Sequence, residues 1–202
     1  MNDYEDFFMI NYKITYLPKK KWKGYNLSIE YMTQNYYDVS IHHTSQKIQI
    51  EIEKKAFDKP IKHTQEEYDF PDNLYASWWK NAKAYGVLKE NELIAAIEIC
   101  PETWSNRLMI TELWVESHYR KQGIGTALIN FVKKQAIKKN YRAIILETQS
   151  CNTTAIEFYL KQEFVLFGFD RSCYHNDDMN RKEVRLNFGW FNSQFYEPLI
   201  NE

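Results

Sequence analysis

The sequence predicts a single α+β domain built on a mixed sheet, and three observations lead to that prediction. A chain of 202 residues with 44% hydrophobic side chains is long enough to bury one sizeable core. Hydrophobic periodicity gives the order strands, helix, strand, helix, strands, which is typical of an α+β layout. No repeat, low-complexity run or linker interrupts the chain. We therefore expect residues 1–70 to be an N-terminal elaboration of the same domain and residues 71–202 to form its core.

Two β-hairpins are predicted from alternating side chains. Residues 37–42 and 48–53 alternate apolar and polar residues on either side of a polar segment, which indicates an antiparallel hairpin with one buried face. The second hairpin joins residues 84–88 and 93–100 through a polar turn. Its second arm, LIAAIEIC, is almost entirely apolar, as expected of a central strand. Further strands are predicted at residues 108–115, 143–148, 164–169 and 184–191.

Helices are predicted at three places. Pro71 and Asp72 are typical of a helix start, and the apolar face of this helix would hold Leu74, Tyr75, Trp78 and Trp79. Apolar residues from 124 to 139 recur with a spacing of about 3.6 residues, which predicts an amphipathic helix. Thr154 and Glu157 have the spacing of a capping box, and the helix that they begin would end near Gln162.

Three of the apolar strands each carry one glutamate, namely Glu98, Glu112 and Glu147. Burying an unpaired carboxylate costs several kcal/mol or forces the group to take up a proton. The alternative for any single glutamate is a position at a strand end, where its carboxylate would be in contact with water. The recurrence of the same pattern in three strands favours a shared acidic cleft, which is where a cationic substrate would bind.

A basic, glycine-containing segment precedes the helix at 124–139. From Tyr119 to Arg142 there are seven Lys or Arg residues and no acid, in a chain of net charge −1. Glycines at a helix N-terminus let an anion approach unpaired N–H groups, so the segment suits a phosphate or pyrophosphate. A solvated helix face is the alternative. A phosphate-binding P-loop and a dinucleotide fingerprint are both excluded, because the segment has only Arg120-x-x-Gly123-x-Gly125.

This motif resembles the acyl-CoA pyrophosphate loop of the GNAT superfamily of N-acetyltransferases. A second motif agrees with it, N-x-x-A-x-x-x-Y-x-K-x-x-F, matched by Asn152, Ala155, Tyr159, Lys161 and Phe164. The resemblance covers residues 84–169 and implies a central, mostly antiparallel twisted sheet flanked by helices. It implies acetyl-CoA as co-substrate, bound by Trp114, Val115, Arg120, Lys121, Gln122, Gly123, Ile124, Gly125, Thr126, Asn152, Ala155 and Lys161.

A narrower resemblance is to the streptothricin acetyltransferases, through Leu146-Glu147-Thr148-Gln149 and the acids in the strands. In that group an amine of a cationic antibiotic is acetylated, so the resemblance implies a small cationic amine as acceptor. The expected substrate-binding residues are Glu98, Trp104, Glu147, Asp170 and Tyr174.

The resemblance implies direct transfer in a ternary complex, without an acyl-enzyme. Glu112 would act as general base for the ammonium or as a proton relay through water, and Tyr159 would protonate the departing thiolate. Peptide N–H groups near Trp114 and Val115 would hold the thioester carbonyl where strand 108–115 separates from strand 143–148. Core packing is the alternative role of Tyr159, and Cys151 is not expected to be a nucleophile.

One departure from the family pattern is Glu163, which stands where family members usually have a glycine that ends the helix in a left-handed conformation. Two other functions remain open: acetylation of a peptide or protein amine, and a non-catalytic acyl-CoA-binding module.

Composition excludes several other classes. A net charge of −1 argues against a dedicated nucleic-acid binder, and no apolar run approaches the ~20 residues that span a bilayer. Three scattered cysteines argue against a disulfide framework and favour the cytoplasm. No His, Cys or Asp spacing is typical of a metal site, so we expect no metal. Family members are often dimers, which leaves a homodimer open.

Overall fold

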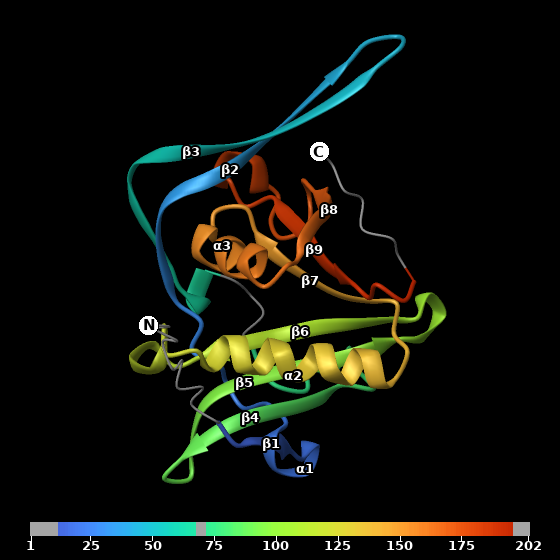
Figure 1. The fold of residues 1–202 in the computed structure, drawn as a ribbon. Coiled ribbons are helices and arrows are strands. Elements are labelled where there is room, and N and C mark those ends of the chain that lie inside the picture. The colour runs from blue at the N-terminus through green and yellow to red at the C-terminus, as the bar shows by residue number, and fades with distance from the viewer. Residues whose placement is uncertain (1–11, 68–71, 196–202) are drawn as a thin grey trace, which may run out of the picture.

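The computed structural model describes residues 12–67 and 72–195. A seven-stranded sheet of order β1-β4-β5-β6-β7-β9-β8 forms the body, and β2 and β3 form a separate two-stranded ribbon (Figure 1). In the large sheet only the β6–β7 pair is parallel. The predicted α+β class and the mostly antiparallel sheet are confirmed.

The strands of the body are β1 (Ile14–Leu17), β4 (Lys83–Lys89), β5 (Glu92–Glu102), β6 (Arg107–Val115), β7 (Ala143–Gln149), β8 (Val165–Asp170) and β9 (Arg185–Phe191). The ribbon consists of β2 (Tyr31–His43) and β3 (Ile48–His63). The α-helices of the described residues are α1 (Lys19–Trp22), α2 (Ile124–Lys138), α3 (Thr153–Lys161) and α4 (Asp178–Arg181). Short 3₁₀ turns lie at Gln65–Glu67, Thr103–Ser105 and Ser117–Tyr119.

Two hydrophobic clusters cover the two faces of the sheet. The larger one joins the sheet to α2 and α3 through residues such as Ile97, Leu128 and Phe164. The smaller one includes residues of β1 and α1 together with Leu74 and Trp114. Neighbouring side chains of a strand point to opposite faces. Glu98, which lies between Ile97 and Ile99 of the larger cluster, therefore points to the same face as the smaller one.

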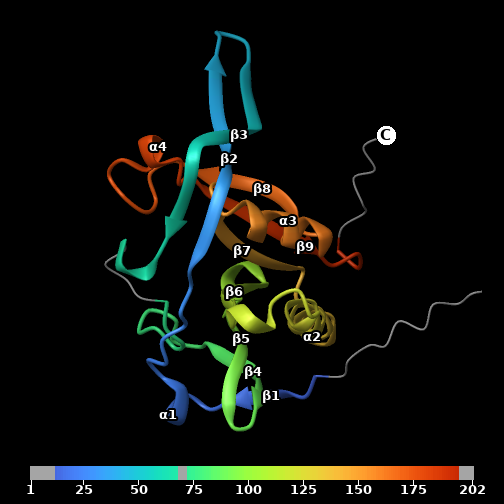
Figure 2. The same cartoon turned by 90° about the vertical axis from the view of Figure 1, so that its left-hand side faces the viewer.

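Both predicted hairpins are confirmed. In the β4–β5 turn Glu90 and Asn91 have φ values of 51° and 69°, which is the left-handed geometry that a two-residue hairpin turn requires. The ribbon extends further than predicted and projects from the body (Figures 1 and 2). Its expected buried face exists only where the ribbon packs on the main core, at Val39, which is 3% exposed. Towards the tip, Ile48 and Ile50 are 64% and 51% exposed, because no part of the described chain covers them.

This difference predicts unequal effects of two isoleucine substitutions. Ile50→Thr should change the free energy of unfolding by no more than about 0.5 kcal/mol, as expected at an exposed position. Ile97→Ala, at a side chain that is 0% exposed, should cost about 2–5 kcal/mol. Urea denaturation of both variants measures the two values. Equal losses would contradict the ribbon's exposed position.

The helix predicted to start at Pro71 and Asp72 is wrong from Asp72 onward; Pro71 lies outside the described residues. The backbone there pairs with residues 25–27 instead: Leu74 N donates to Tyr25 O (3.1 Å) and Leu27 N donates to Asp72 O (2.8 Å). Tyr75 then turns with a φ of 61°. Two of the four residues of the predicted apolar face, Leu74 and Tyr75, are buried, whereas Trp78 is 57% exposed. Tertiary pairing therefore overrides the local helical periodicity.

The helix at α3 is confirmed, but its predicted capping box is wrong. Asn152 caps the helix, because its side chain accepts a hydrogen bond from Ala155 N (3.2 Å). Glu157 forms an ion pair with Lys54 of β3 instead of capping Thr154 (2.6 Å). Glu163 has a φ of 63°, so it takes the left-handed conformation itself without a glycine.

Candidate active site

The parallel strands β6 and β7 pair over a short stretch and then separate. Their register covers only residues 107–109 of β6 and 143–145 of β7, and Figure 1 shows the two strands diverging beyond it. From Ile110 to Val115, therefore, no strand of the described residues pairs with the edge of β6 that faces β7. Unpaired peptide groups on such an edge are available to a ligand. This is the separation that the sequence analysis expected near Trp114 and Val115.

Residues 28–31 cross the mouth of this gap. The indole N–H of Trp114 in β6 donates to Ser28 O (3.2 Å), and the Tyr31 hydroxyl donates to Gln149 Oε1 in β7 (2.5 Å). The Trp114 side chain therefore fixes residue 28 and is buried, so only its backbone remains for a ligand. A cleft of about 530 Å³ lies beside this crossing, lined by Ser28, Glu30, Tyr31, Met32, Lys62, Trp114, Glu116, Ser117 and Arg120.

The predicted pyrophosphate loop lies at the N-terminus of α2. Gly123 caps this helix with a φ of 82°, and a Cβ added there would meet no atom within 4 Å. The helix has no acid in its first turn, and its first amide that bonds to Gly123 O is that of Ala127 (2.9 Å). The amides of Ile124, Gly125 and Thr126 are therefore left for another acceptor, close to the positive end of the helix dipole.

The other loop residues join the loop to neighbouring segments or are exposed. The Arg120 guanidinium donates to Val115 O (3.0 Å) and Glu30 O (3.3 Å), so it fastens the loop to β6 and to the crossing segment. Lys121 and Gln122 are exposed, and Thr126 accepts a hydrogen bond from Gln162 (3.3 Å). Gly125 is needed for packing, because a Cβ there would lie 3.2 Å from the Phe158 ring of α3.

On α3 the predicted cofactor residues lie apart. Asn152 and Ala155 are partly buried at the start of the helix, while Lys161 is exposed in its last turn. Tyr159, on the same helix, is 9% exposed and its ring lies 6.0 Å from that of Phe164. Burial raises the pKa of Tyr159, and the charge of Glu112 raises it further. The raised pKa keeps the hydroxyl protonated at neutral pH. No described residue forms a hydrogen bond with this hydroxyl, so it is available as a donor.

Glu98 and Glu112 are direct cross-strand partners on β5 and β6. Glu98 is 0% exposed, and its carboxylate accepts hydrogen bonds from Tyr75 N (2.5 Å) and the Thr111 hydroxyl (2.9 Å). Burial raises the pKa of Glu98, and these two hydrogen bonds oppose the rise. Thr111 sits at an irregularity in the β5–β6 register, which turns its hydroxyl toward Glu98.

Glu112 is the most perturbed acid of the group. Burial raises its pKa well above the usual value, and the charges of Asp72, Glu98 and Glu147 raise it further. Among the described residues, none forms a hydrogen bond or an ion pair with Glu112. The expected convergence of the glutamates therefore occurs, with Asp72 added. Sequence reasoning missed Asp72 because the segment after it read as a helix.

Glu147 and Asp170 have a cation that the sequence analysis also missed. Arg185 of β9 lies between them, with Nη1 3.1 Å from Glu147 Oε2 and Nη2 3.5 Å from Asp170 Oδ2. Desolvation raises the pKa of Glu147 in spite of Arg185, whereas hydrogen bonds from Ser172 lower that of Asp170. The available signal was a cationic residue, Arg185, at the start of the last predicted strand.

The two aromatic residues that were predicted to bind the substrate, Tyr174 and Trp104, are placed differently. Tyr174 is partly buried in the loop after β8, and burial together with the charge of Glu147 raises its pKa. Asp178 holds this loop by accepting from Tyr174 N (2.8 Å). Trp104 is 83% exposed and its ring lies against Arg107 (5.7 Å), with no contact to the acids among the described residues. The structure therefore brings Tyr174 to the acidic group and leaves Trp104 outside it.

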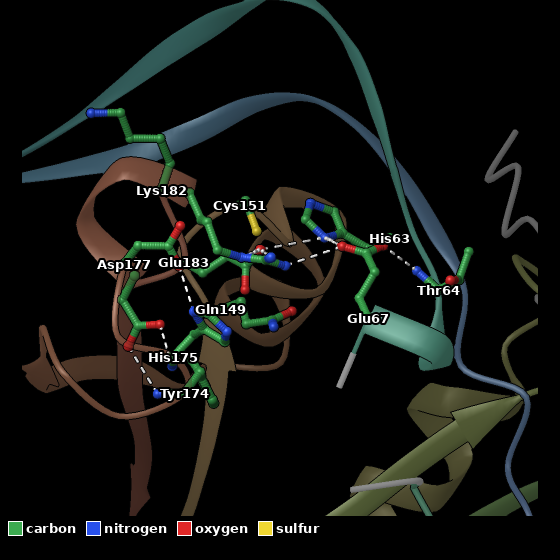
Figure 3. Close-up of polar contacts among 12 residues, drawn as sticks. His63, Thr64, Glu67, Gln149, Cys151, Tyr174, His175, Asp177, Lys182 and Glu183 are labelled. Carbon is green, nitrogen blue, oxygen red and sulfur yellow. Dashed lines mark hydrogen bonds and ion pairs between the residues drawn. The ribbon is translucent and has the colours of Figure 1, made fainter. Parts of the chain in front are cut away.

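A second charged cluster lies where β3 ends, beside the residues that precede β9 (Figure 3). The ligand atoms of His63, Glu67 and Glu183 lie within 4.8 Å of one another. The Arg181 guanidinium contacts both carboxylates, at 3.1 Å and 2.9 Å, and supplies the positive charge that a metal would otherwise bring. We therefore interpret this cluster as an ion-pair network. Next to it, burial raises the pKa of Cys151 to about 12, which argues against a nucleophilic thiolate.

Comparison with known proteins identifies the arrangement. The model of the acetyltransferase (GNAT) family matches residues 50–164. Streptothricin acetyltransferase of Escherichia coli is 31% identical over 112 residues, which are 55% of this chain and 64% of that protein, so the match spans less than two thirds of it. Streptothricin acetyltransferase A of Bacillus subtilis strain 168 is 31% identical over 123 residues, 61% of this chain and 69% of that protein.

Solved structures agree on the fold. A nourseothricin acetyltransferase superposes with a TM-score of 0.70 at 18% identity, covering 89% of this chain and 98% of that one. A Bacillus anthracis protein described as a streptothricin acetyltransferase, solved in complex with acetyl coenzyme A, gives 0.68 at 25% identity, with 90% and 98% covered. In the described part of this chain, no helix is both long and apolar enough to cross a membrane. The family model covers more than half of the chain, and the separated strands and glycine loop have their places within it, so this protein belongs to the acetyltransferase (GNAT) family.

Proposed function

We propose that this protein transfers the acetyl group of acetyl-CoA to a primary amine of a small cationic acceptor of the streptothricin type, by direct attack in a ternary complex. The observation that carries the proposal is Glu112. It is a carboxylate without an ion-pair partner among the described residues, and it raises the pKa of the Tyr159 hydroxyl. The names of the 31% identical relatives support the choice of acceptor.

Acetyl-CoA would use the two sets of unpaired peptide groups. The amides at the start of α2 suit its pyrophosphate, because the helix dipole favours negative charge and Gly123 leaves open space. The unpaired edge of β6 suits the amide-containing arm and the thioester carbonyl. The acetyl group would then lie between β6 and β7, with Glu112 of β6 on one side of it and Tyr159 of α3 on the other.

The chemistry needs two proton transfers. A primary ammonium, with a pKa of about 10, must lose a proton before its nitrogen can attack. Glu112 takes that proton, the nitrogen forms a bond to the thioester carbon, and the C–S bond breaks. Tyr159 donates its proton to the departing thiolate and regains one from the former ammonium nitrogen. Amide, free thiol and one released proton are the products.

The cofactor part of the proposal is tested by ligand-induced stability. Acetyl-CoA at a hundredfold excess over its dissociation constant should raise the free energy of unfolding by about 2.7 kcal/mol. Gly123→Val should abolish this gain, because the side chain fills the space in front of the helix amides.

Gly24→Val is the matched control for backbone strain. Gly24 has a φ of 77° and equally open surroundings, so valine costs similar strain there without touching the loop. This control should keep the full gain with acetyl-CoA. The loop assignment would fail if folded Gly123→Val kept the gain as well.

The acceptor part is tested by thiol release from acetyl-CoA with three kinds of acceptor. We expect rapid thiol release with streptothricin. We expect slow thiol release with a lysine-containing peptide or with a simple amine that carries no further charged group. Faster turnover of the peptide would favour the peptide or protein acetyltransferase. If acetyl-CoA stabilises the protein but no amine causes thiol release, the protein would be a non-catalytic acyl-CoA-binding module.

A further inference from the structure

The acidic group of the site is divided into two parts by one arginine. The first part consists of Asp72, Glu98 and Glu112, which lie on or beside β5 and β6. Among the described residues, the only cation whose charge acts on this part is Lys19, which acts on Glu98. Glu147 and Asp170 lie on β7 and β8 and share Arg185. The two parts are electrostatically joined, because the charge of Glu147 acts on Glu112.

Arg185 is held in place from both sides. In the sheet it is the direct cross-strand neighbour of Asp170 on β8 and of Gln149 on β7, two residues beyond Glu147. Its two terminal nitrogens contact one carboxylate each, and its side chain is 29% exposed. A planar guanidinium that bridges two carboxylates has a fixed orientation. An acceptor cation could replace it only by separating these ion pairs.

We propose that Arg185 is a specificity-determining residue, which occupies the carboxylates of Glu147 and Asp170 so that the acceptor's ammonium is bound at Glu112 alone. The inference rests on the proposed function, because it concerns the acceptor of that same site. Among the described residues, Glu112 has no hydrogen-bond or ion-pair partner, and its charge is the one that raises the pKa of Tyr159. An ammonium bound at Glu112 would be next to the acid that acts on Tyr159, the proposed proton donor. An ammonium bound between Glu147 and Asp170 would be held on β7 and β8 rather than at Glu112.

Arg185 also limits how many charges of an acceptor can bind. A second ammonium on the same acceptor would meet the Arg185 guanidinium and be repelled. Without Arg185, Glu147 and Asp170 would form a second cation site next to the first. The protein should therefore treat a diamine like a monoamine, and a variant without the arginine should prefer the diamine.

The experiment measures amine binding directly, by isothermal titration calorimetry of the whole protein with acetyl-CoA replaced by CoA. The ligands are butylamine and the diamines from ethylenediamine to cadaverine, a series that allows for the unknown spacing of the two sites. For wild type we expect similar dissociation constants for butylamine and for the best diamine. For Arg185→Gln we expect the best diamine to bind about tenfold more tightly than butylamine.

Two variants serve as controls. Arg185→Lys keeps a cation and should keep the wild-type ratio. Arg181→Gln removes an arginine that also bridges two carboxylates, Glu67 and Glu183, at the other cluster, and it should leave the ratio unchanged. If Arg185→Gln does not fold, Arg185→Gln combined with Asp170→Asn removes one of the repelling acids, and a smaller gain of the diamine, from Glu147 alone, is expected.

The proposal is overturned if the ratio of the two dissociation constants stays at the wild-type value in folded Arg185→Gln, or if Arg181→Gln changes it equally. If Arg185 had a purely structural role, its loss would raise the dissociation constants of butylamine and of the diamine by the same factor. The proposed function is judged separately, by wild-type acetylation of streptothricin. Failure there, with the diamine preference present, rejects the acceptor but keeps the role of Arg185 in amine binding.

Discussion

Tyr159→Phe should reduce kcat by roughly 10²–10⁴-fold, because the variant has no proton to give to the departing thiolate. This loss corresponds to about 3 to 5.5 kcal/mol of transition-state stabilisation. Burial and the charge of Glu112 raise the pKa of Tyr159, so the wild-type hydroxyl carries its proton throughout the neutral range. Single-turnover release of CoA thiol, followed with streptothricin as acceptor, measures the loss.

The stability of the same variant separates chemistry from packing. Phenylalanine keeps the ring contacts with Phe164 and Phe188, so the free energy of unfolding and the dissociation constant of acetyl-CoA should both remain close to wild type. An activity within threefold of wild type would make Tyr159 a core residue. Leu160→Ala, at the next position, which is 46% exposed, is the control for changes on α3 and should retain activity.

Glu112→Gln should lower kcat by roughly 10²–10⁴-fold, since an amide cannot accept the ammonium proton. The acidic limb of the wild-type kcat profile should lie well above pH 4.5, because burial and the neighbouring acids raise the pKa of Glu112. This limb should disappear in the variant. Steady-state rates between pH 5 and 9 at saturating acetyl-CoA test both statements.

Glu98→Gln gives the matched comparison. The charge of Glu98 is one of those that raise the pKa of Glu112. Neutralising it should therefore move the acidic limb to lower pH without removing it. An acidic limb that disappears in Glu98→Gln and persists in Glu112→Gln would assign the base to Glu98.

Stability should change in the opposite direction to activity. The pKa of Glu112 is raised in the folded protein, so above its unfolded pKa of 4.5 the native state keeps a proton that the unfolded state has lost. The free energy of unfolding then falls by about 1.4 kcal/mol per pH unit, until the pH reaches the folded pKa. Glu112→Gln should remove this fall and be more stable than wild type at pH 7, and equally stable near pH 4. Thermal unfolding at both pH values checks the sign.

Local patterns carried most of the fold prediction, and they failed where distant segments compete. The strands from residue 84 onward and the helix at α2 have one consistent period each, and packing reinforces that period. Residues 72–81 also have a helical period, but the peptide groups of residues 72–74 pair with residues 24–27, a segment that no local rule links to them. The ribbon alternates like a half-buried hairpin, and only its position relative to the body decides that its tip is exposed.

Local features of the chain were enough to predict the kind of chemistry. The spacing of Arg120, Gly123 and Gly125 before an amphipathic helix needs only local geometry, and so does the presence of one glutamate in each of three apolar strands. The tertiary structure decided the charge of the site, since it added Asp72, gave Arg185 to Glu147 and Asp170, and left Glu112 without a partner among the described residues. The physical reason is that a carboxylate's proton affinity depends on burial and on charges brought near it through space. Those neighbours come from strands that lie far apart along the chain.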